Sequence, residues 1–143
     1  MNLLQIAITF FVFIEILNIM TLYFSPGASY GNGVGVFKAY HECQKDEKVF
    51  SLVSYLVNWI AGAKLIFIMI GLVVVIFGNE MTQIGTVVAL IISISSFYFR
   101  LYPAIKKLDE DGEVTTKGFS KTLNYMIVIF LVMFTTSLII YLH

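Results

Sequence analysis

Four long apolar segments make up most of this chain, and each is long enough to cross a lipid bilayer as a helix. A helix rises about 1.5 Å per residue, so about 20 apolar residues span the roughly 30 Å of hydrocarbon. The segments cover about residues 2–24, 53–77, 81–102 and 122–142. The sequence therefore predicts an all-α, polytopic membrane protein. We expect residues 1–143 to form a single integral membrane domain, a bundle of four transmembrane helices.

The composition supports this expectation. Of the 143 residues, 59% are hydrophobic and 13% are charged, whereas about 25% of the residues in a soluble domain are charged. A mean hydropathy of +0.89 leaves too few polar residues to cover a water-soluble globule. The net charge is zero, so the chain has no overall positive field that would attract nucleic acid.

Positive charges outside the apolar segments are confined to two of the three loops and their borders. One loop covers about residues 25–52 and the other about 103–121. The third connection, residues 78–80, is a short hairpin that carries no Lys or Arg. The cations are Lys38, Lys45, Lys48, Arg100, Lys106, Lys107, Lys117 and Lys121. Loops rich in Lys and Arg stay in the cytoplasm. We therefore expect an N-out, C-out topology in a cell membrane, either a plasma membrane or a bacterial inner membrane, with the lipid bilayer as partner.

Two ionisable side chains are expected inside the membrane, Glu15 in the first helix and Lys64 in the second. Counted from the cytoplasmic ends of their helices, Glu15 lies roughly 13 Å deep and Lys64 roughly 16 Å deep, so the two can meet. Each costs about 2.5–3.5 kcal/mol at the bilayer centre, and such residues are usually functional or paired. One interpretation is an ion pair that sets the helix register. The other is a proton or cation site at Glu15 that Lys64 regulates.

Further polar residues are expected in the same, cytoplasmic half of the bundle. They would surround a cavity that is open to the cytoplasm and closed on the outside. Its basic groups would suit an anionic or carbonyl-bearing ligand, although Arg100 could instead reach lipid headgroups with Lys106 and Lys107. The complete predicted intramembrane binding site is Glu15, Asn18, Asn58, Lys64, Ser96, Arg100 and Asn124.

Small residues recur on one face of the third helix. Gly85, Ala89 and Ser93 are four residues apart, a spacing that lets transmembrane helices approach closely. Gly62, at the centre of Ala61–Gly62–Ala63 in the second helix, is the expected partner surface. The pattern predicts a helix-packing seam. With only four helices, it also suggests self-association into a homo-oligomer or assembly into a larger membrane complex.

No metal, cofactor or catalytic motif is complete in the sequence. The stretch Gly31–Gly35 follows no strand, and no Lys-Ser/Thr pair completes a phosphate loop. The acidic run Asp109–Glu113 does not align with a calcium-binding loop. The two histidines, His41 and His143, fall on opposite sides of the predicted membrane. We therefore expect no bound metal and no cofactor, and an enzymatic role is not favoured.

Glu15 lies midway along the first helix of a small four-helix protein, and in this it resembles the small multidrug resistance transporters. In that family the carboxylate exchanges protons for cationic drugs, which implies a similar role for Glu15. The resemblance covers Glu15 and the helix count. The chain departs from the family in its much longer first loop and in Lys64, a cation that would repel a cationic substrate.

Three hypotheses of function follow. The first is binding or transport of a small solute or a proton at the cytoplasm-facing intramembrane site. The second is a non-catalytic accessory or assembly subunit of a membrane complex, in which the polar pairs specify packing. The third is a membrane-embedded enzyme acting on a lipid or isoprenoid substrate, for which the sequence offers a carboxylate, a lysine and tyrosines but no motif.

Overall fold

The computed structural model describes residues 1–143, of which 81% are helical, with no strands. The prediction of an all-α chain is confirmed. Four helical stretches are long and apolar enough to span a membrane, namely α1, α3, α4 continued by α5, and α6. The elements are α1 (Leu3–Phe24), the short 3-10 helix η1 (Val34–Val36), α2 (Lys38–Cys43), α3 (Glu47–Phe77), α4 (Glu80–Ser95), α5 (Phe97–Glu110) and α6 (Phe119–Leu142).

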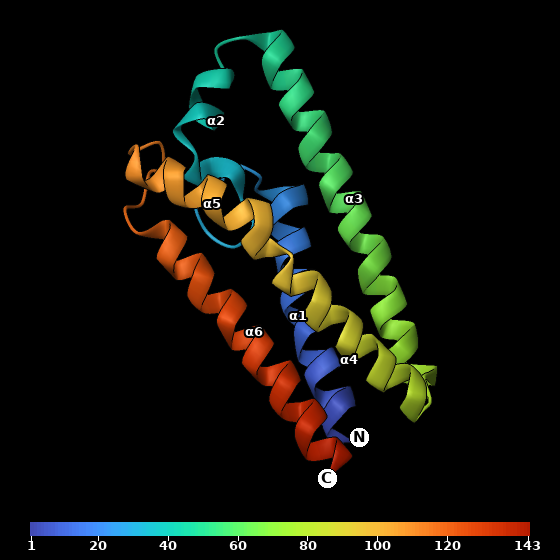
Figure 1. Cartoon of the computed structure of the whole chain (residues 1–143). Helices are drawn as coiled ribbons and strands as arrows, with labels where there is room; N and C mark the ends of the chain where they lie inside the picture. The colour runs from blue at the N-terminus through green and yellow to red at the C-terminus, as the bar shows by residue number, and fades with distance from the viewer.

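The helices run roughly up and down between two distinct ends (Figure 1). Both chain termini and the α3–α4 hairpin lie at one end, here called the hairpin end. At the other end, here called the loop end, lie α2 and the connection between α5 and α6. Helix α1 packs along α3 and also against α6, and α6 packs against α4 and α5. Helices α3 and α4 diverge from their hairpin, so that little of one lies against the other.

The main core lies between α1, α3, α4 and α6. The fully buried side chains Leu4 and Ile8 of α1, Val87 of α4 and Phe134 of α6 all belong to it. The ring of Phe11 packs edge-on against Phe134, with a centroid distance of 5.6 Å. In lipid, such interlocking stabilises a bundle through van der Waals contact rather than through exclusion of water. This packing holds α4 to α6 and leaves α3 attached mainly to α1.

The outward surfaces of the helices are apolar. Only 24 of the 143 residues are buried, so most large apolar side chains lie on the outside of the bundle. Exposed apolar surface on this scale is typical of a protein that contacts membrane. The exterior is therefore compatible with a small membrane protein.

Side-chain caps explain why two helices begin earlier than predicted. The carboxylate of Asp46 accepts hydrogen bonds from the backbone N–H groups of Lys48 and Val49, so α3 begins at Glu47 rather than near residue 53. The carboxylate of Asp109 accepts hydrogen bonds from the N–H groups of Gly118 and Ser120, both at 2.9 Å, and α6 begins at residue 119 rather than near 122.

The third predicted helix, residues 81–102, is two helices in the structure. The predicted end near residue 102 is wrong, because α5 contains Pro103 and continues to Glu110. The break lies instead at Ser96, between α4 and α5. There the Ser96 hydroxyl donates a 2.6 Å hydrogen bond to the carbonyl of Ser93. Side-chain bonding of this kind competes with the helical backbone pattern and bends helices.

The two lysine-bearing loops join at the loop end into one structure, here called the loop cap (residues 25–46 and 111–118). The N–H of Lys38 donates to the carbonyl of Glu113 at 2.9 Å, and the N–H of Thr115 donates to that of Val36 at 2.8 Å. Val36, Ile105 and Val114 form a small buried cluster beneath these bonds. The loop cap therefore fixes α1, α5 and α6 relative to one another at this end.

Candidate functional site

An ion pair joins α1 to α3 in the middle of the bundle. The Nζ of Lys64 lies 2.5 Å from Oε2 of Glu15. The other carboxylate oxygen, Oε1, accepts a 3.2 Å hydrogen bond from Nδ2 of Asn18, which is buried one turn further along α1. The structure thus brings together three residues of the predicted binding site, Glu15, Asn18 and Lys64.

A close approach of the two helices places this pair. A Cβ atom added to Gly71 of α3 would lie only 2.8 Å from Cγ2 of Val12 in α1. Gly71 lies two turns from Lys64, and Val12 lies about one turn from Glu15, so these residues share the facing sides of α1 and α3. The absence of a side chain at Gly71 lets the backbones come near enough for the long Lys64 and Glu15 side chains to meet.

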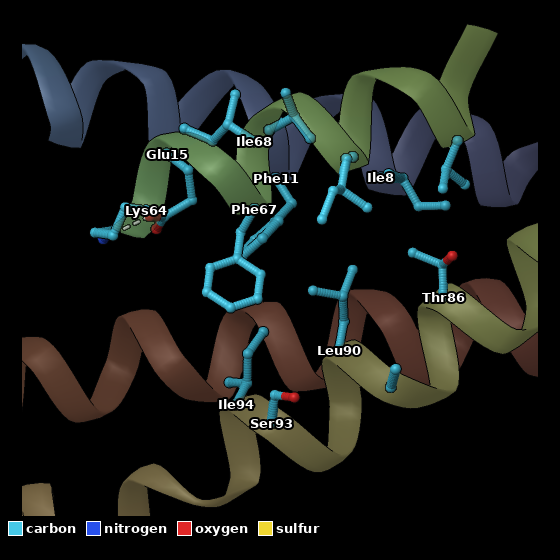
Figure 2. A pocket seen from close by; sticks show the side chains of 15 residues that line it. Ile8, Phe11, Glu15, Lys64, Phe67, Ile68, Thr86, Leu90, Ser93 and Ile94 are labelled. Carbon is cyan, nitrogen blue, oxygen red and sulfur yellow. Dashed lines mark ion pairs between the residues drawn. The ribbon is translucent and has the colours of Figure 1, made fainter. Parts of the chain in front are cut away.

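The ion pair lies at one end of a cavity of about 500 Å³, here called the main groove, between α1, α3 and α4 (Figure 2). The walls are apolar except for the pair itself and two hydroxyl groups. The side chains of Glu15 and Lys64 keep exposed fractions of 16% and 25%. The lining is Ile8, Phe11, Val12, Glu15, Lys64, Phe67, Ile68, Ile70, Gly71, Val74, Thr86, Ala89, Leu90, Ser93 and Ile94.

A second cavity of about 300 Å³, here called the loop-side cavity, lies towards the loop cap. Residues of α1, α3, α5, α6 and the loop cap line it, and Lys64 is their only ionisable member. Lys64 therefore borders both cavities. At this boundary Gly31 of the loop cap has a φ of 57°, a conformation that favours glycine. A Cβ there would lie 3.1 Å from Oδ1 of Asn18, so the glycine lets the loop close over the polar cluster.

A third cavity, of about 530 Å³, lies between α1 and α6 and is here called the α1–α6 groove. It matches the main groove in volume, but no ionisable side chain lines it. Its walls include Phe10 and Val132, and Thr136 lies among them. The two grooves are therefore similar in volume, and only the main groove contains an ion pair.

The other four predicted binding residues do not join this cluster. Asn58 is exposed, and its Nδ2 donates to the carbonyl of Ser54 in its own helix at 2.9 Å. The hydroxyl of Ser96 donates its hydrogen bond to the carbonyl of Ser93 at the end of α4. Arg100 is exposed and lines neither the main groove nor the loop-side cavity, and the same holds for the half-buried Asn124. The main groove and the loop-side cavity therefore enclose only Glu15 and Lys64 of the seven predicted residues.

The predicted packing seam is also not formed within the chain. A Cβ on Gly85 would meet no atom within 4 Å, because α4 diverges from α3. Ala89 and Ser93 line the main groove instead of a helix interface. On α3, Ala61 is buried in a cluster with residues of α1 and α3, and a Cβ on Gly62 would face the Tyr23 hydroxyl of α1 at 3.7 Å. The small residues of α4 thus leave space open.

Sequence reasoning missed Gly71, Val12 and the apolar walls of the main groove. Gly71 was a visible signal, since a glycine inside an apolar helix often marks a close helix contact. No family model, curated protein or solved structure matches the chain. What the main groove can do follows from its chemistry. Apolar walls accommodate hydrocarbon, and an accessible ion pair at one end can bind a polar group.

Proposed function

We propose that this chain is a multi-pass membrane protein, N-out and C-out, that binds a small amphipathic molecule taken from the bilayer. The apolar part of this ligand lies in the main groove, and its polar group lies at the Glu15–Lys64 pair. The observation that carries the proposal is the accessible ion pair at the end of an otherwise apolar groove of about 500 Å³. Small-molecule sites are typically cavities of about 300–1,000 Å³ with apolar walls and a few placed polar groups.

The pair has unused hydrogen-bonding capacity for a ligand. An ammonium group carries three N–H donors, and Lys64 has Glu15 as its only ionic or hydrogen-bonding partner in the chain. A polar group placed inside the membrane at a cost of several kcal/mol is usually paired or functional. Pairing accounts for the charge of Lys64, while the free donors and the exposed fraction of 25% leave it available to a ligand oxygen.

The position of the groove favours a ligand that arrives through the lipid. The groove lies where α3 and α4 diverge, and its wall residues Phe67 and Ile70 are among the exposed apolar side chains of the bundle. Ala89 and Ser93 are small, so α4 does not fill the space. A molecule dissolved in the bilayer reaches such a groove sideways, without crossing water. Access from the lipid makes the sequence-based hypothesis more specific: the ligand is a lipid-soluble, amphipathic molecule rather than any small solute or a proton.

A second candidate function is that of a non-catalytic subunit whose α4 binds a helix of another membrane protein. The open face at Gly85 favours it, because no atom of this chain lies within 4 Å of a Cβ built there. Gly85→Leu would then abolish co-purification with a larger complex from native membranes. A protein that purifies from those membranes only as copies of itself, with or without the substitution, would count against this candidate.

Photochemical labelling tests the proposed ligand site. The protein is reconstituted in phosphatidylcholine nanodiscs with either of two diazirine-bearing probes, a long-chain fatty acid or the corresponding long-chain alkylamine. After irradiation, mass spectrometry maps the adducts. At least one of the two probes should label the main groove, around Val12, Gly71 and Ala89, in a saturable way. The α1–α6 groove serves as an internal control of equal size without an ion pair.

Equal labelling of the two grooves, without saturation, would show that the probes only partition into apolar surface. The proposal would then be wrong. The double variant Glu15→Gln, Lys64→Met gives the second control. The loss of both charges of the polar anchor should remove saturable labelling of the main groove and leave background labelling of the α1–α6 groove unchanged.

A further inference from the structure

We propose that the ligand of the main groove is an anionic amphiphile, with a carboxylate or phosphate group that binds the Lys64 ammonium in place of Glu15. This inference rests on the function proposed above and adds the charge of the ligand. Lys64 borders both the main groove and the loop-side cavity, whereas Glu15 borders the main groove alone. The cation is therefore the member of the pair that a polar group can reach from two sides.

The hydrogen bonds of the pair are unequal. Both carboxylate oxygens of Glu15 are engaged, one by Lys64 and the other by Asn18. The ammonium of Lys64 contacts Glu15 alone and keeps further N–H donors free. If an anionic ligand takes Lys64, Glu15 keeps its bond from Asn18. If a cationic ligand took Glu15 instead, Lys64 would be left inside the bundle without any partner, which is costly.

No other charge in either cavity offsets this preference. The linings contributed by α4, α5, α6 and the loop cap contain no ionisable side chain, so Glu15 and Lys64 alone face the ligand. In the loop-side cavity the only charge is positive. A group bound there therefore meets a cation and no carboxylate.

The groove also sets the direction of the ligand. The pair lies at one end of the main groove, and Thr86 and Ile8 lie towards the other (Figure 2). Thr86 is six residues from the start of α4, which begins at the hairpin. The polar group of the ligand thus points to the loop end and its hydrocarbon to the hairpin end. With the loops in the cytoplasm, the polar group of the ligand faces the cytoplasm and its hydrocarbon lies in the outer half of the membrane.

Competition between matched ligands tests the charge. Saturable labelling of the main groove in nanodiscs is measured with each photoreactive probe while an unlabelled competitor is added. The competitors are a long-chain fatty acid, its methyl ester and the alkylamine of the same length. The acid should compete at a concentration at least about tenfold lower than the ester or the amine, which corresponds to about 1.4 kcal/mol. An octadecyl phosphate competitor distinguishes a phosphate preference from a carboxylate preference.

Variants test the exchange at Lys64. Lys64→Met should abolish labelling by the fatty-acid probe, and Lys64→Arg should retain it because the positive charge is kept. Glu15→Gln should raise the affinity for the acid severalfold, since the competing carboxylate is gone. Circular dichroism and gel filtration establish that each variant is folded. The competitor series uses the wild-type protein, so it decides the question even where a variant fails to fold.

The two proposals fail differently. If no probe labels the main groove above the α1–α6 groove, the proposed function is wrong and the charge preference falls with it. If the groove is labelled but the amine or the ester competes as well as the acid, only the anionic preference is overturned. A weaker affinity for the acid in folded Glu15→Gln would overturn the exchange between ligand and Glu15.

Discussion

Removing either member of the Glu15–Lys64 pair should destabilise the protein, and the effects of the two changes should not be additive. The two atoms Nζ and Oε2 are 2.5 Å apart, and the two side chains are about three-quarters or more buried. Breaking a buried pair by removing one partner typically costs about 3–5 kcal/mol, because the other charge is left uncompensated. Since part of each side chain still faces the groove, we expect the lower end of that range, about 3 kcal/mol, for Glu15→Gln and for Lys64→Met.

The double variant should cost much less than the sum of the two single changes. With both charges gone, no uncompensated ion is left in the bundle. A pair in direct contact shows coupling energies of about 0.5–3 kcal/mol, and the short distance and burial place this pair in the upper half of that range, at about 2 kcal/mol. Chemical denaturation of the four proteins in one detergent gives the free energies of unfolding.

The chain supplies a matched control for this cycle. Lys106 and Glu110 form an ion pair on the surface of α5, with a distance of 3.8 Å and exposed fractions of 54% and 66%. Exposed pairs of this spacing contribute about 0.3–0.5 kcal/mol. The Lys106→Met, Glu110→Gln cycle should therefore show little coupling. Additive effects at Glu15 and Lys64, or a protein that Glu15→Gln makes more stable, would refute the reasoning.

The remaining predictions concern packing, pH and topology. Gly71→Ala should lower the free energy of unfolding by about 1–3 kcal/mol, because the new methyl group would meet Val12. Gly85→Ala should leave this free energy unchanged or raise it by up to about 1 kcal/mol, because a Cβ there meets no atom and alanine favours the helix. Equal effects would contradict the packing of α1 on α3. The pKa of Asp109 is held below its usual value of 3.8, first by the hydrogen bond from the Ser120 hydroxyl and then by the N–H groups of Gly118 and Ser120. The ionised Asp109 carboxylate therefore stabilises the fold fully above pH 3.8, and this stabilisation is lost as the pH falls through the lowered pKa. The melting temperatures of wild type and Asp109→Asn should differ at neutral pH and converge in acid. The single cysteine, Cys43, lies at the loop end. An impermeant maleimide should therefore label it in inside-out vesicles and not in right-side-out vesicles. The opposite result would reverse the proposed topology.

That Glu15 and Lys64 can meet could be predicted from their equal depth, whereas the close approach of α1 and α3 at Gly71, which brings them together, was missed. Two antiparallel helices that cross the same layer bring residues of equal depth to the same level, and residue counts give that depth. The four helical segments could also be predicted, because backbone N–H and C=O groups in lipid must form hydrogen bonds within their own segment. The charged residues of the apolar segments, Glu15 and Lys64, were therefore enough to predict the polar centre of the site.

The main groove could not be predicted, because it depends on which helices diverge. The small residues Gly85, Ala89 and Ser93 are compatible with a tight seam or with an open groove. The outcome is set by α4 packing on α6 through residues such as Phe134 and by α1 approaching α3 at Gly71. These are contacts between segments far apart in the chain.

The break in the third helix was misplaced for a local reason. The predicted end near residue 102 lies next to Pro103, but membrane helices tolerate a proline where other groups bond to the freed backbone positions. The helix is interrupted earlier, at Ser96, whose hydroxyl donates a hydrogen bond to the carbonyl of Ser93. Arg100, in α5, is exposed and does not line the main groove, so it does not join the ion pair as predicted.

The most direct test of the central claim is to block the main groove without touching its charges. Ala89 lies on the α4 wall of that groove, and Thr136 lies in the α1–α6 groove of similar volume; both are exposed. Saturable probe labelling in nanodiscs is compared for wild type, Ala89→Phe and Thr136→Phe, with thermal stability as the check on folding. If the main groove is the ligand site, Ala89→Phe abolishes saturable labelling and Thr136→Phe leaves it unchanged. Equal labelling of both folded variants would contradict the claim.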